Sequence, residues 1–296
     1  MRTFRIWLMA ARPRTLPAAI APVLVGTAAA VEVSEELRVG PFFAALVGSV
    51  LIQIGTNLAN DYSDARRGAD DVDRLGPVRV TAAGLVTPRR VLVATWIAFA
   101  GAVAVGVYLA AVAGPVILAV GAASILAGVL YTGGPRPYGY AGLGELFVFL
   151  FFGLVAVNGS YFVQLERLDW LPFAISVPVG MLATAILVVN NVRDVETDRR
   201  AGKHTLAVRL GRERARRLYV ALVLGAYVLL AAGLAAAGAP LAAVIAYASL
   251  PLVISPLQTV LERTDGPSLN GALAQTGALL GGFSVLLTAG LLLPAL

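Results

Sequence analysis

The sequence contains no cysteine and only one histidine, His204, among its 296 residues. The absence of cysteine excludes disulfides, thiolate nucleophiles, iron–sulfur ligation and zinc sites built on sulfur. A single histidine cannot form a multi-histidine metal site. Charged residues are also scarce, at 14%, whereas hydrophobic residues reach 58% and the mean hydropathy is +0.82. Ordinary globular domains carry about 25% charged residues, so this composition indicates a polytopic membrane protein.

Long apolar runs make up most of the sequence. A membrane-spanning helix needs about 20 consecutive, mainly apolar residues. Nine such runs can be marked, over residues 16–32, 41–60, 91–112, 115–133, 144–163, 171–192, 217–237, 239–260 and 270–294. The tract from 91 to 133 is divided at Gly114-Pro115, because proline ends helices. We therefore expect an all-α polytopic membrane protein with about nine helices in a single bundle, and a single domain over residues 1–296.

The basic residues predict which helix ends face the cytoplasm. Of the 23 basic residues, 21 fall in the N-terminal tail or in loops on one side of the membrane, and only Arg38 and Arg167 fall on the other. The positive-inside rule then places the N-terminus in the cytoplasm, and an odd number of helices places the C-terminus outside. Topology thereby accounts for the formal net charge of +6, and nucleic acid is not an expected partner. We expect a multi-pass protein of the cytoplasmic membrane.

The N-terminus also resembles a secretory signal, since arginines precede an apolar stretch that ends in Ala28-Ala29-Ala30. Pro17 and Pro22 interrupt the apolar part, however, and the positive region is long for a signal peptide. The further apolar runs make a cleavable targeting segment redundant. We therefore expect this segment to remain as the first helix of the bundle.

An acidic stretch, Asn60-Asp61-Tyr62-Ser63-Asp64, follows directly on the second apolar run. Gln53 and Asn57 precede it at spacings of three and four residues, so these polar groups form one stripe along a helix. An ionised group at the centre of a membrane helix costs about 3 kcal/mol on insertion scales. Acidic groups at such a helix end therefore indicate a functional site. Taken alone, Gln53 and Asn57 can simply hold neighbouring helices together.

A second acidic stretch closes the sixth apolar run. Asn190, Asp194 and Asp198 follow one another at intervals of four residues, with Asn191 and Arg193 beside them. Carboxylates at positions i and i+4 of a helix repel each other unless a cation lies between them. Magnesium suits such hard oxygen ligands, and it commonly holds a phosphate-bearing substrate through one or two carboxylates. The alternative for each stretch is a solvated acidic loop without a function.

The occurrence of two such stretches favours a shared site. Four predicted crossings, an even number, separate them, so both emerge on the same face of the membrane and can face each other. A short internal echo, between residues 64–68 and 198–202, is expected if two halves of the chain repeat. The arrangement indicates paired metal sites around a charged ligand.

Both acidic stretches resemble the paired aspartate signature of the UbiA superfamily of intramembrane prenyltransferases, and the resemblance covers most of the chain. Other segments are similar to the menaquinone branch of that superfamily. These are Ala11-Arg12-Pro13-Arg14-Thr15-Leu16-Pro17, Ala21-Pro22-Val23, residues 76–84, Tyr131-Thr132-Gly133-Gly134-Pro135, Gly142-Leu143-Gly144-Glu145, residues 190–194 and residues 198–207.

The resemblance implies a reaction. A polyprenyl group would pass from polyprenyl diphosphate to 1,4-dihydroxy-2-naphthoate, with loss of diphosphate and carbon dioxide, giving demethylmenaquinol in menaquinone biosynthesis. A UbiA-type prenyltransferase acting on another aromatic acceptor, such as 4-hydroxybenzoate, is the alternative. The implied partners are the two substrates and the lipid bilayer, and the implied cofactor is Mg²⁺.

The resemblance also implies roles for individual residues. The expected catalytic carboxylates are Asp61, Asp64, Asp194 and Asp198, which with Asp70 are also the expected Mg²⁺ ligands. Gly68 occupies the position where many members of the superfamily have a further aspartate, a departure common in the naphthoate branch. Asp70 is the expected substitute, because glycine before it frees the backbone.

The remaining expected roles concern the substrates. The expected diphosphate ligands are Asn57, Asn60, Arg79, Arg136, Arg193 and Lys203, since arginine is suited to bidentate phosphate contacts. Asn191 and Tyr131 are the expected substrate contacts. Each arginine can alternatively serve membrane topology alone. Further aromatic candidates are Tyr138, Phe147, Phe151 and Tyr161, although membrane aromatics more often pack or anchor at an interface.

Other classes of membrane protein share some of these features. A secondary transporter also has many helices and repeats, but its coupling residues usually lie near the midplane on broken helices, whereas the charges here lie at one surface. A CDP-alcohol phosphotransferase also uses aspartates at the membrane edge, but Asn190 and Asn191 stand where its aspartate–glycine and alanine–arginine pattern would be. A purely structural subunit would not need two facing acidic stretches. The function implied by the resemblance, that of a Mg²⁺-dependent prenyltransferase, is therefore preferred to these alternatives.

Overall fold

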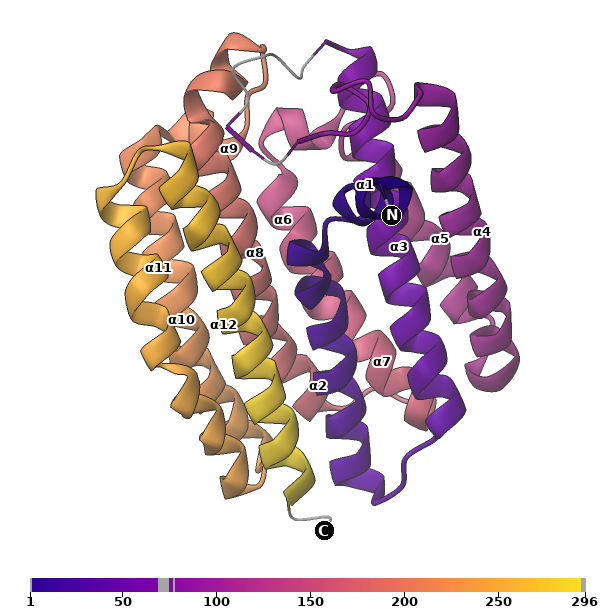
Figure 1. The fold of residues 1–296 in the computed structure, drawn as a ribbon. Coiled ribbons are helices and arrows are strands. Elements are labelled where there is room, and N and C mark those ends of the chain that lie inside the picture. Colours follow the sequence, from indigo (N-terminus) through magenta and orange to yellow (C-terminus); the bar gives the residue numbers. More distant parts are fainter. Residues whose placement is uncertain (1, 69–74, 77, 294–296) are drawn as a thin grey trace.

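The computed structural model describes residues 2–68, 75–76 and 78–293, and within these ranges every regular element is a helix (Figure 1). The helices are α1 (Arg2–Ala11), α2 (Leu16–Ser34), α3 (Val39–Arg66), α4 (Pro88–Ala113), α5 (Val116–Leu130), α6 (Gly144–Val148), α7 (Ala156–Leu165), α8 (Trp170–Arg200), α9 (Leu206–Leu210), α10 (Arg212–Ala237), α11 (Pro251–Glu262) and α12 (Gly266–Leu292). A π-helical segment, Phe149–Val155, joins α6 to α7, and a 3₁₀ segment, Leu241–Ser249, leads into α11. The predicted all-α membrane fold is confirmed.

Seven helices in the described part of the chain are long and apolar enough to span a membrane. Leu241–Ser249 and α11 are bent by 41° at their junction and make an eighth span if they are taken together. Helix α5 has 15 residues, fewer than the roughly 20 that a full span needs. Each predicted apolar run overlaps one of these helical segments, while the number of nine crossings stays a prediction.

The break between α4 and α5 lies at the predicted place. Gly114 has a φ of 95°, a conformation that favours glycine, and its N–H donates to the Ala110 carbonyl at 2.9 Å. Pro115 follows directly and precedes the first residue of α5. Because proline has no N–H, it fits at the start of a helix better than inside one.

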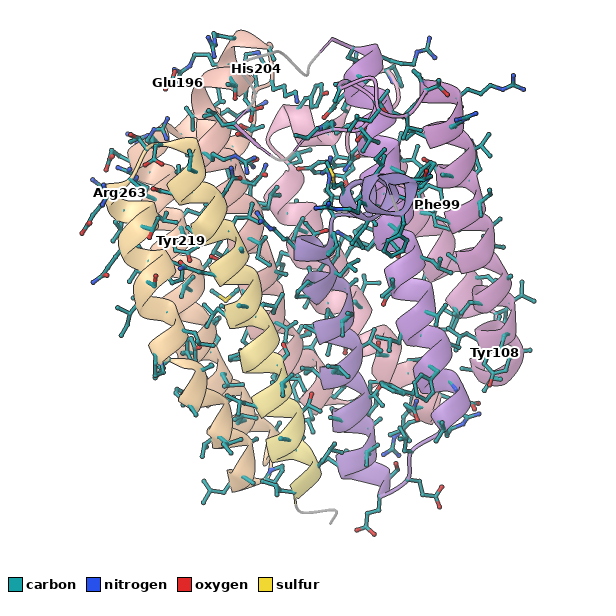
Figure 2. The ribbon with its side chains drawn as sticks, viewed as in Figure 1. Phe99, Tyr108, Glu196, His204, Tyr219 and Arg263 are labelled. Atoms are coloured by element: carbon teal, nitrogen blue, oxygen red, sulfur yellow. The ribbon has the colours of Figure 1, made fainter. Side chains whose placement is uncertain are left out.

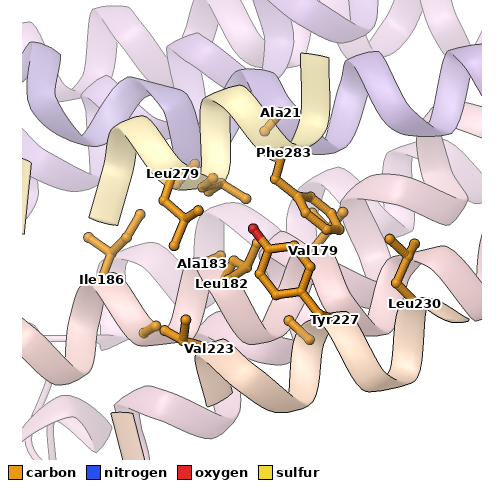
Figure 3. Packing of buried hydrophobic residues seen from close by; sticks show 14 of the residues in the cluster. Ala21, Val179, Leu182, Ala183, Ile186, Val223, Tyr227, Leu230, Leu279 and Phe283 are labelled. Atoms are coloured by element: carbon orange, nitrogen blue, oxygen red, sulfur yellow. The ribbon is translucent and has the colours of Figure 1, made fainter. Parts of the chain in front are cut away.

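The apolar core is centred on α8, which packs against α2, α10 and α12 (Figure 3). Val179 and Leu182 of α8 are fully buried, as are Val223 of α10 and Phe283 of α12. In the most apolar window of α8, 78% of the residues are buried, against 28% in α4. Helix α8 is therefore an interior helix, and α4 presents an apolar outer face, as a helix in contact with lipid does.

Close packing against α8 depends on glycine at one place. A Cβ at Gly153, in the π-helical segment, would lie 2.6 Å from the Cα of Gly180 and 3.0 Å from the carbonyl oxygen of Ser176. Small residues of this kind let helix backbones approach each other in a membrane. The two backbones therefore touch where no side chain can be inserted.

Loops gather at one end of the bundle, termed here the capped end. It consists of residues 78–87, 131–143 and 201–211 together with the ends of α3 and α8 (Figure 1). A main-chain hydrogen bond of 2.9 Å, from His204 N–H to the Tyr140 carbonyl, joins two of these loops. Glu196 and His204 lie at the capped end, and Tyr108 lies toward the opposite end (Figure 2). Helices α3 and α8 thus carry both acidic stretches to the same end.

Candidate active site

A cavity of about 400 Å³ lies within the bundle and reaches the capped end. Its lining includes three acidic residues and three basic residues, which are Asp64, Asp194, Asp198, Arg12, Arg79 and Lys203. The rest of its wall is mostly apolar and comes from helices α2 to α8, including the π-helical segment. A cavity that is charged at one end and apolar along its wall suits a long amphipathic ligand.

Asp64, near the end of α3, is 1% exposed and is surrounded by groups that balance its charge. It forms ion pairs with Arg79 and, at 3.7 Å, with Lys203 Nζ, and the Tyr140 hydroxyl donates a hydrogen bond to its Oδ1. The three partners come from three different loops of the capped end. A buried carboxylate needs such partners because an isolated charge would be very costly there.

Tyr140 stays protonated as a donor to Asp64. Burial, and next the negative charge of Asp64, raise the pKa of Tyr140 above its ordinary value of 10.0. Lys203 Nζ lies 4.8 Å from the centroid of the Tyr140 ring, and the Arg67 guanidinium lies 5.9 Å from it. Both distances fall within the range of about 6 Å for cation–π attraction. No role was predicted for Tyr140, because no local sequence pattern marks it.

On α8, Asp194 is held by its neighbour Arg193. Arg193 Nε donates to Asp194 Oδ1 at 2.7 Å and Nη2 donates to Oδ2 at 2.5 Å. The same guanidinium donates to Asn190 Oδ1 at 2.8 Å and to Asn270 Oδ1 at 2.6 Å. Arg193 is 1% exposed and lies behind the cavity wall, whereas Asp194 is part of that wall. Arg193 therefore fixes the orientation of Asp194, and its direct contact with diphosphate stays a prediction.

Asp198 lies one helical turn beyond Asp194 and also lines the cavity. Its carbonyl oxygen accepts the Lys203 N–H at 2.8 Å, and its carboxylate lies 3.5 Å from Thr205 Oγ1. Thr205 in turn caps α9 by accepting the Val208 N–H at 3.4 Å. The chain therefore folds back after α8 and brings Lys203, the only lysine, to the cavity.

Two further residues of the predicted set, Asp61 and Arg136, lie outside the cavity lining. Both carboxylate oxygens of Asp61 accept backbone hydrogen bonds from the loop before α4, and Asp61 is not part of the cavity lining. Arg136 is exposed on the 131–143 loop and is not part of the lining either. Asp70 falls outside the described residues. The expected metal role of Asp61 and diphosphate role of Arg136 stay predictions, which the positions of these side chains do not support.

The predicted amide contacts differ in what they bind. Asn57 Nδ2 and Gln53 Nε2 both donate to Thr15 Oγ1, each at 3.1 Å. These bonds join α3 to the start of α2. They agree with the alternative interpretation, in which Gln53 and Asn57 hold neighbouring helices together. Asn60 Oδ1 instead accepts the Thr132 hydroxyl at 2.8 Å. Asn57 and Asn60 nevertheless both line the cavity and remain available to a ligand there.

Glu145 is a buried carboxylate for which no role at the site was predicted from the sequence. It lies at the start of α6, is 7% exposed, and its Oε1 accepts Asn191 Nδ2 at 2.8 Å. Its Oε2 has no hydrogen-bond partner among the described residues. Because Asn191 lines the cavity, this bond leaves the amide oxygen of Asn191 to a ligand. The one sequence signal that could have indicated this residue is a single carboxylate at the start of an apolar run.

Arg12 is a cation for which no role at the site was predicted from the sequence. It lies at the turn between α1 and α2, with a φ of 54°, and its carbonyl accepts the Thr15 N–H at 2.9 Å. This turn places Arg12 in the cavity lining. An arginine before a proline carries no local signal for such a position.

Aromatic rings form a continuous row along the cavity wall. Tyr131 meets Tyr138 edge to face, with 5.4 Å between ring centroids, and Tyr138 stacks on Phe147 at 4.0 Å. Phe147 and Phe151 follow at 6.1 Å, and all four residues line the cavity. Aromatic faces can stabilise a passing cation. Tyr131, a predicted contact, is therefore one member of a larger aromatic wall, and Tyr161 is not part of it.

The donor set at the charged end fits a magnesium ion that is shared with a phosphate-bearing ligand. Asp64, Asp194 and Asp198 offer hard oxygen donors on two facing helices. Within the described ranges, no group of three or more acidic or histidine side chains could hold a metal ion. Mg²⁺ is usually bound by one or two carboxylates together with water and substrate phosphate oxygens, without a complete protein cage. These carboxylates therefore suit a Mg²⁺ ion that binds together with a phosphate-bearing ligand.

Comparison with known sequences identifies relatives of the whole chain. The profile of the UbiA prenyltransferase family matches residues 19–279. The 1,4-dihydroxy-2-naphthoate octaprenyltransferase of Mycobacterium tuberculosis is 50% identical over 77% of this chain and 78% of that protein. The protein of the same name from Mycobacterium leprae is 41% identical over 94% of this chain and 92% of that protein.

Solved structures share the fold. The apo structure of a UbiA homolog from Aeropyrum pernix K1 is similar with a TM-score of 0.69 at 16% identity, covering 94% of this chain and 98% of that one. A UbiA homolog from Archaeoglobus fulgidus, bound to GPP and Mg²⁺, has a TM-score of 0.63 at 17% identity, covering 95% and 99%. At these identities the likeness establishes the arrangement of the helices.

Proposed function

The chain belongs to the UbiA prenyltransferase family, and from that membership we propose that it transfers a polyprenyl group from polyprenyl diphosphate to 1,4-dihydroxy-2-naphthoate. Diphosphate and carbon dioxide are released, and the product is demethylmenaquinol, an intermediate of menaquinone biosynthesis. One observation carries the proposal: Asp64 of α3 and Asp194 and Asp198 of α8 line a single cavity with an apolar wall. The chain is also 50% identical to a relative named for this acceptor.

The apolar wall provides a place for the isoprenoid tail. Burial of each methylene contributes about 0.8 kcal/mol, so a long tail stays in apolar surroundings while its diphosphate stays at the surface. The chain is an integral membrane protein, and its cavity combines an apolar wall with a charged capped end. The donor can therefore bind without its tail entering water.

Arg79 and Lys203 are the cations that we assign to the diphosphate. In the structure they pair with Asp64, so their positions are set before any substrate arrives. Charges that are preorganised in this way stabilise a leaving group without reorganising during the reaction. Mg²⁺ ions that arrive with the diphosphate would supply Lewis-acid neutralisation of the leaving group, and Asp64, Asp194 and Asp198 are the carboxylates available to hold them. Arg193 keeps the Asp194 carboxylate oriented for that task.

Carbon–carbon bond formation follows the loss of diphosphate. The carbon–oxygen bond of the donor breaks, the acceptor ring attacks the allylic carbon, and the ring carboxylate leaves as carbon dioxide. Tyr131 and Phe147 line the cavity, and their ring faces can stabilise the allylic cation. The loops of the capped end exclude water, which would otherwise capture the cation.

We assign the capped end to the cytoplasmic side of the cytoplasmic membrane, and with it the N-terminus. Arg79, Arg136 and Lys203 lie in loops at this end, whereas Arg38, paired with Glu166 at 3.0 Å, lies between α2 and α3 at the other. An excess of basic residues marks the cytoplasmic side. Labelling of single cysteines introduced into these loops, in intact cells and in lysed cells, checks this assignment.

Purified protein in liposomes is expected to prenylate 1,4-dihydroxy-2-naphthoate, with one carbon dioxide released per product, when Mg²⁺ is present. A parallel reaction uses 4-hydroxybenzoate, and mass spectrometry identifies the products. Product from 4-hydroxybenzoate alone would overturn the acceptor that we assign. Product from neither acceptor would overturn prenyl transfer to these aromatic rings.

Replacing Glu145 with glutamine is expected to weaken substrate binding without unfolding the bundle. Glutamine can both donate and accept, so it no longer fixes which side of the Asn191 amide faces the cavity. A hydrogen bond to a charged group contributes about 1.5–3 kcal/mol, so KM for one of the two substrates should rise about tenfold or more. Steady-state kinetics of Glu145→Gln, with the exposed Glu166→Gln as a control, measures this. Unchanged KM values for both substrates would contradict it.

A further inference from the structure

Asp61 is a buried carboxylate to which the proposed mechanism gives no task. It is 2% exposed, and each of its oxygens accepts one backbone hydrogen bond. Oδ2 accepts the Val80 N–H at 2.9 Å, and Oδ1 accepts the Thr81 N–H at 3.0 Å. One side chain of α3 thereby holds two consecutive peptide groups of the loop that leads to α4.

The loop that Asp61 holds is a compact turn. The N–H groups of Leu85 and Val86 both donate to the Val80 carbonyl, at 2.9 and 3.1 Å, and the Gly84 N–H donates to the Thr81 carbonyl at 3.0 Å. Gly84 has a φ of 66°, which lets the chain reverse. Val80 is fully buried in a small apolar cluster. The turn is therefore one piece, attached to α3 through Asp61 and through Val80.

Arg79 directly precedes the two peptide groups that Asp61 holds. Its Nη1 donates to the Asn60 carbonyl at 2.7 Å, and its guanidinium pairs with Asp64 and lines the cavity. Asn60, Asp61 and Asp64 all lie near the end of α3. The same helix end therefore holds both the arginine and the backbone from which it extends, so the position of the guanidinium depends on the bond to Asp61.

We propose that Asp61 is a positioning residue that holds Arg79 at the diphosphate end of the cavity, and not a metal ligand. The role of Arg79 in this statement rests on the proposed function. Turning the Asp61 carboxylate toward a metal would leave the buried N–H groups of Val80 and Thr81 without their partners, which is costly in a site closed to water. Asp61 thereby shapes the binding of diphosphate through the loop.

Asp61→Asn tests the proposal, because it places an N–H₂ group where one accepting oxygen faces a backbone N–H. The KM for polyprenyl diphosphate is expected to rise about tenfold, the scale of losing a hydrogen bond to a charged group. The Mg²⁺ concentration for half-maximal activity should stay at the wild-type value. Hydrogen exchange at the amides of Val80 and Thr81 should become about tenfold faster. If Asp61→Asn does not accumulate as folded protein, Asp61→Glu is measured in the same way, since its longer side chain displaces the loop.

Two further variants separate positioning from other roles. Arg79→Gln should raise the same KM. The double variant Asp61→Asn/Arg79→Gln should have a KM no higher than that of Arg79→Gln alone, because both changes disrupt the same contact, the one between Arg79 and the diphosphate. Asp265→Asn is the matched control. Asp265 also accepts a backbone N–H, from Ser268 at 2.9 Å, but it lies at the start of α12 and outside the cavity lining. Its kinetics should equal those of the wild type.

Three results would overturn the proposal. An Mg²⁺ requirement raised as far as in Asp64→Asn would identify Asp61 as a metal ligand. Full additivity of the Asp61 and Arg79 substitutions would show that they act independently. Wild-type hydrogen exchange at Val80 and Thr81 would show that Asp61 does not hold the loop. The two proposals can fail separately. Absence of prenyl transfer in the wild-type protein would refute the proposed function, whereas hydrogen exchange needs no substrate and would still show whether Asp61 holds the loop.

Discussion

Replacing Asp64 with asparagine is expected to lower kcat/KM for polyprenyl diphosphate by about a hundredfold to a thousandfold, the scale of losing one preorganised electrostatic group. Asp64 is 1% exposed, lines the cavity and pairs with Arg79 and Lys203. The change removes a charged oxygen assigned to Mg²⁺. It also leaves two buried cations without their anion, so the groups that receive the diphosphate lose their fixed positions.

The matching change on the facing helix is Asp194→Asn, for which the same loss is expected. Glu196→Gln is the control, because Glu196 lies two residues further along α8 with a side chain that is 61% exposed and paired with Arg199. Steady-state kinetics with a Mg²⁺ titration measures all three variants. Activity within tenfold of the wild type in both aspartate variants would show that these carboxylates are not the metal site.

Introducing a leucine at Gly153 is expected to prevent the bundle from folding stably. Even a Cβ there would lie 2.6 Å from the Cα of Gly180, so the π-helical segment and α8 would have to move apart to make room. Inserting extra methylenes into a packed core costs about 1–3 kcal/mol when side chains can rearrange. A clash between two backbones should exceed that range, and whole proteins have a free energy of unfolding of only about 5–15 kcal/mol.

Size-exclusion chromatography in detergent and thermal unfolding measure this effect. Gly271→Leu is the matched control, since Gly271 lies on α12 and a Cβ there would meet nothing within 4 Å. The control should elute as the wild type does, whereas Gly153→Leu should aggregate or unfold at a much lower temperature. Equal unfolding temperatures for Gly153→Leu and the wild type would contradict the close packing against α8.

The helices were predictable because their length is set along the chain. A membrane-spanning helix requires a minimum length of apolar sequence. Gly114-Pro115 ends one such run by its own local geometry, independently of contacts with the rest of the chain. The predicted run 115–133 accordingly overlaps α5 at Val116–Leu130. The apolar pattern could not predict which helices are buried inside the bundle. Helices α4 and α8 are both long and apolar, yet of these two α8 is the interior one. Burial depends on neighbours that are distant in sequence.

The same distinction applies to the site. Asp194 and Asp198 were predicted to face one ligand because both lie on one helix at a spacing of four, and both line the cavity. Asp61 and Asp64 were grouped at a spacing of three, but a helix turns by about 100° per residue, so their side chains diverge by about 60°. Asp64 meets the cavity and Asp61 meets residues 80 and 81. Glu145 was missed because its partner, Asn191, lies 46 residues away.

Because α8 lies inside the bundle, the residues assigned to catalysis and many of the residues that can vary lie on different helices. This helix supplies Val179 and Leu182 to the core and Asp194 and Asp198 to the cavity, so most changes along it endanger folding or chemistry. The apolar wall comes instead largely from peripheral helices such as α4 and α5, whose outer faces are exposed. Substitutions on α4 and α5 can widen or narrow this wall and leave the central helix untouched. Proteins with this architecture can therefore acquire new tail lengths or acceptors in evolution by changing their periphery, while the reactive groups and the foundation of the fold are inherited together.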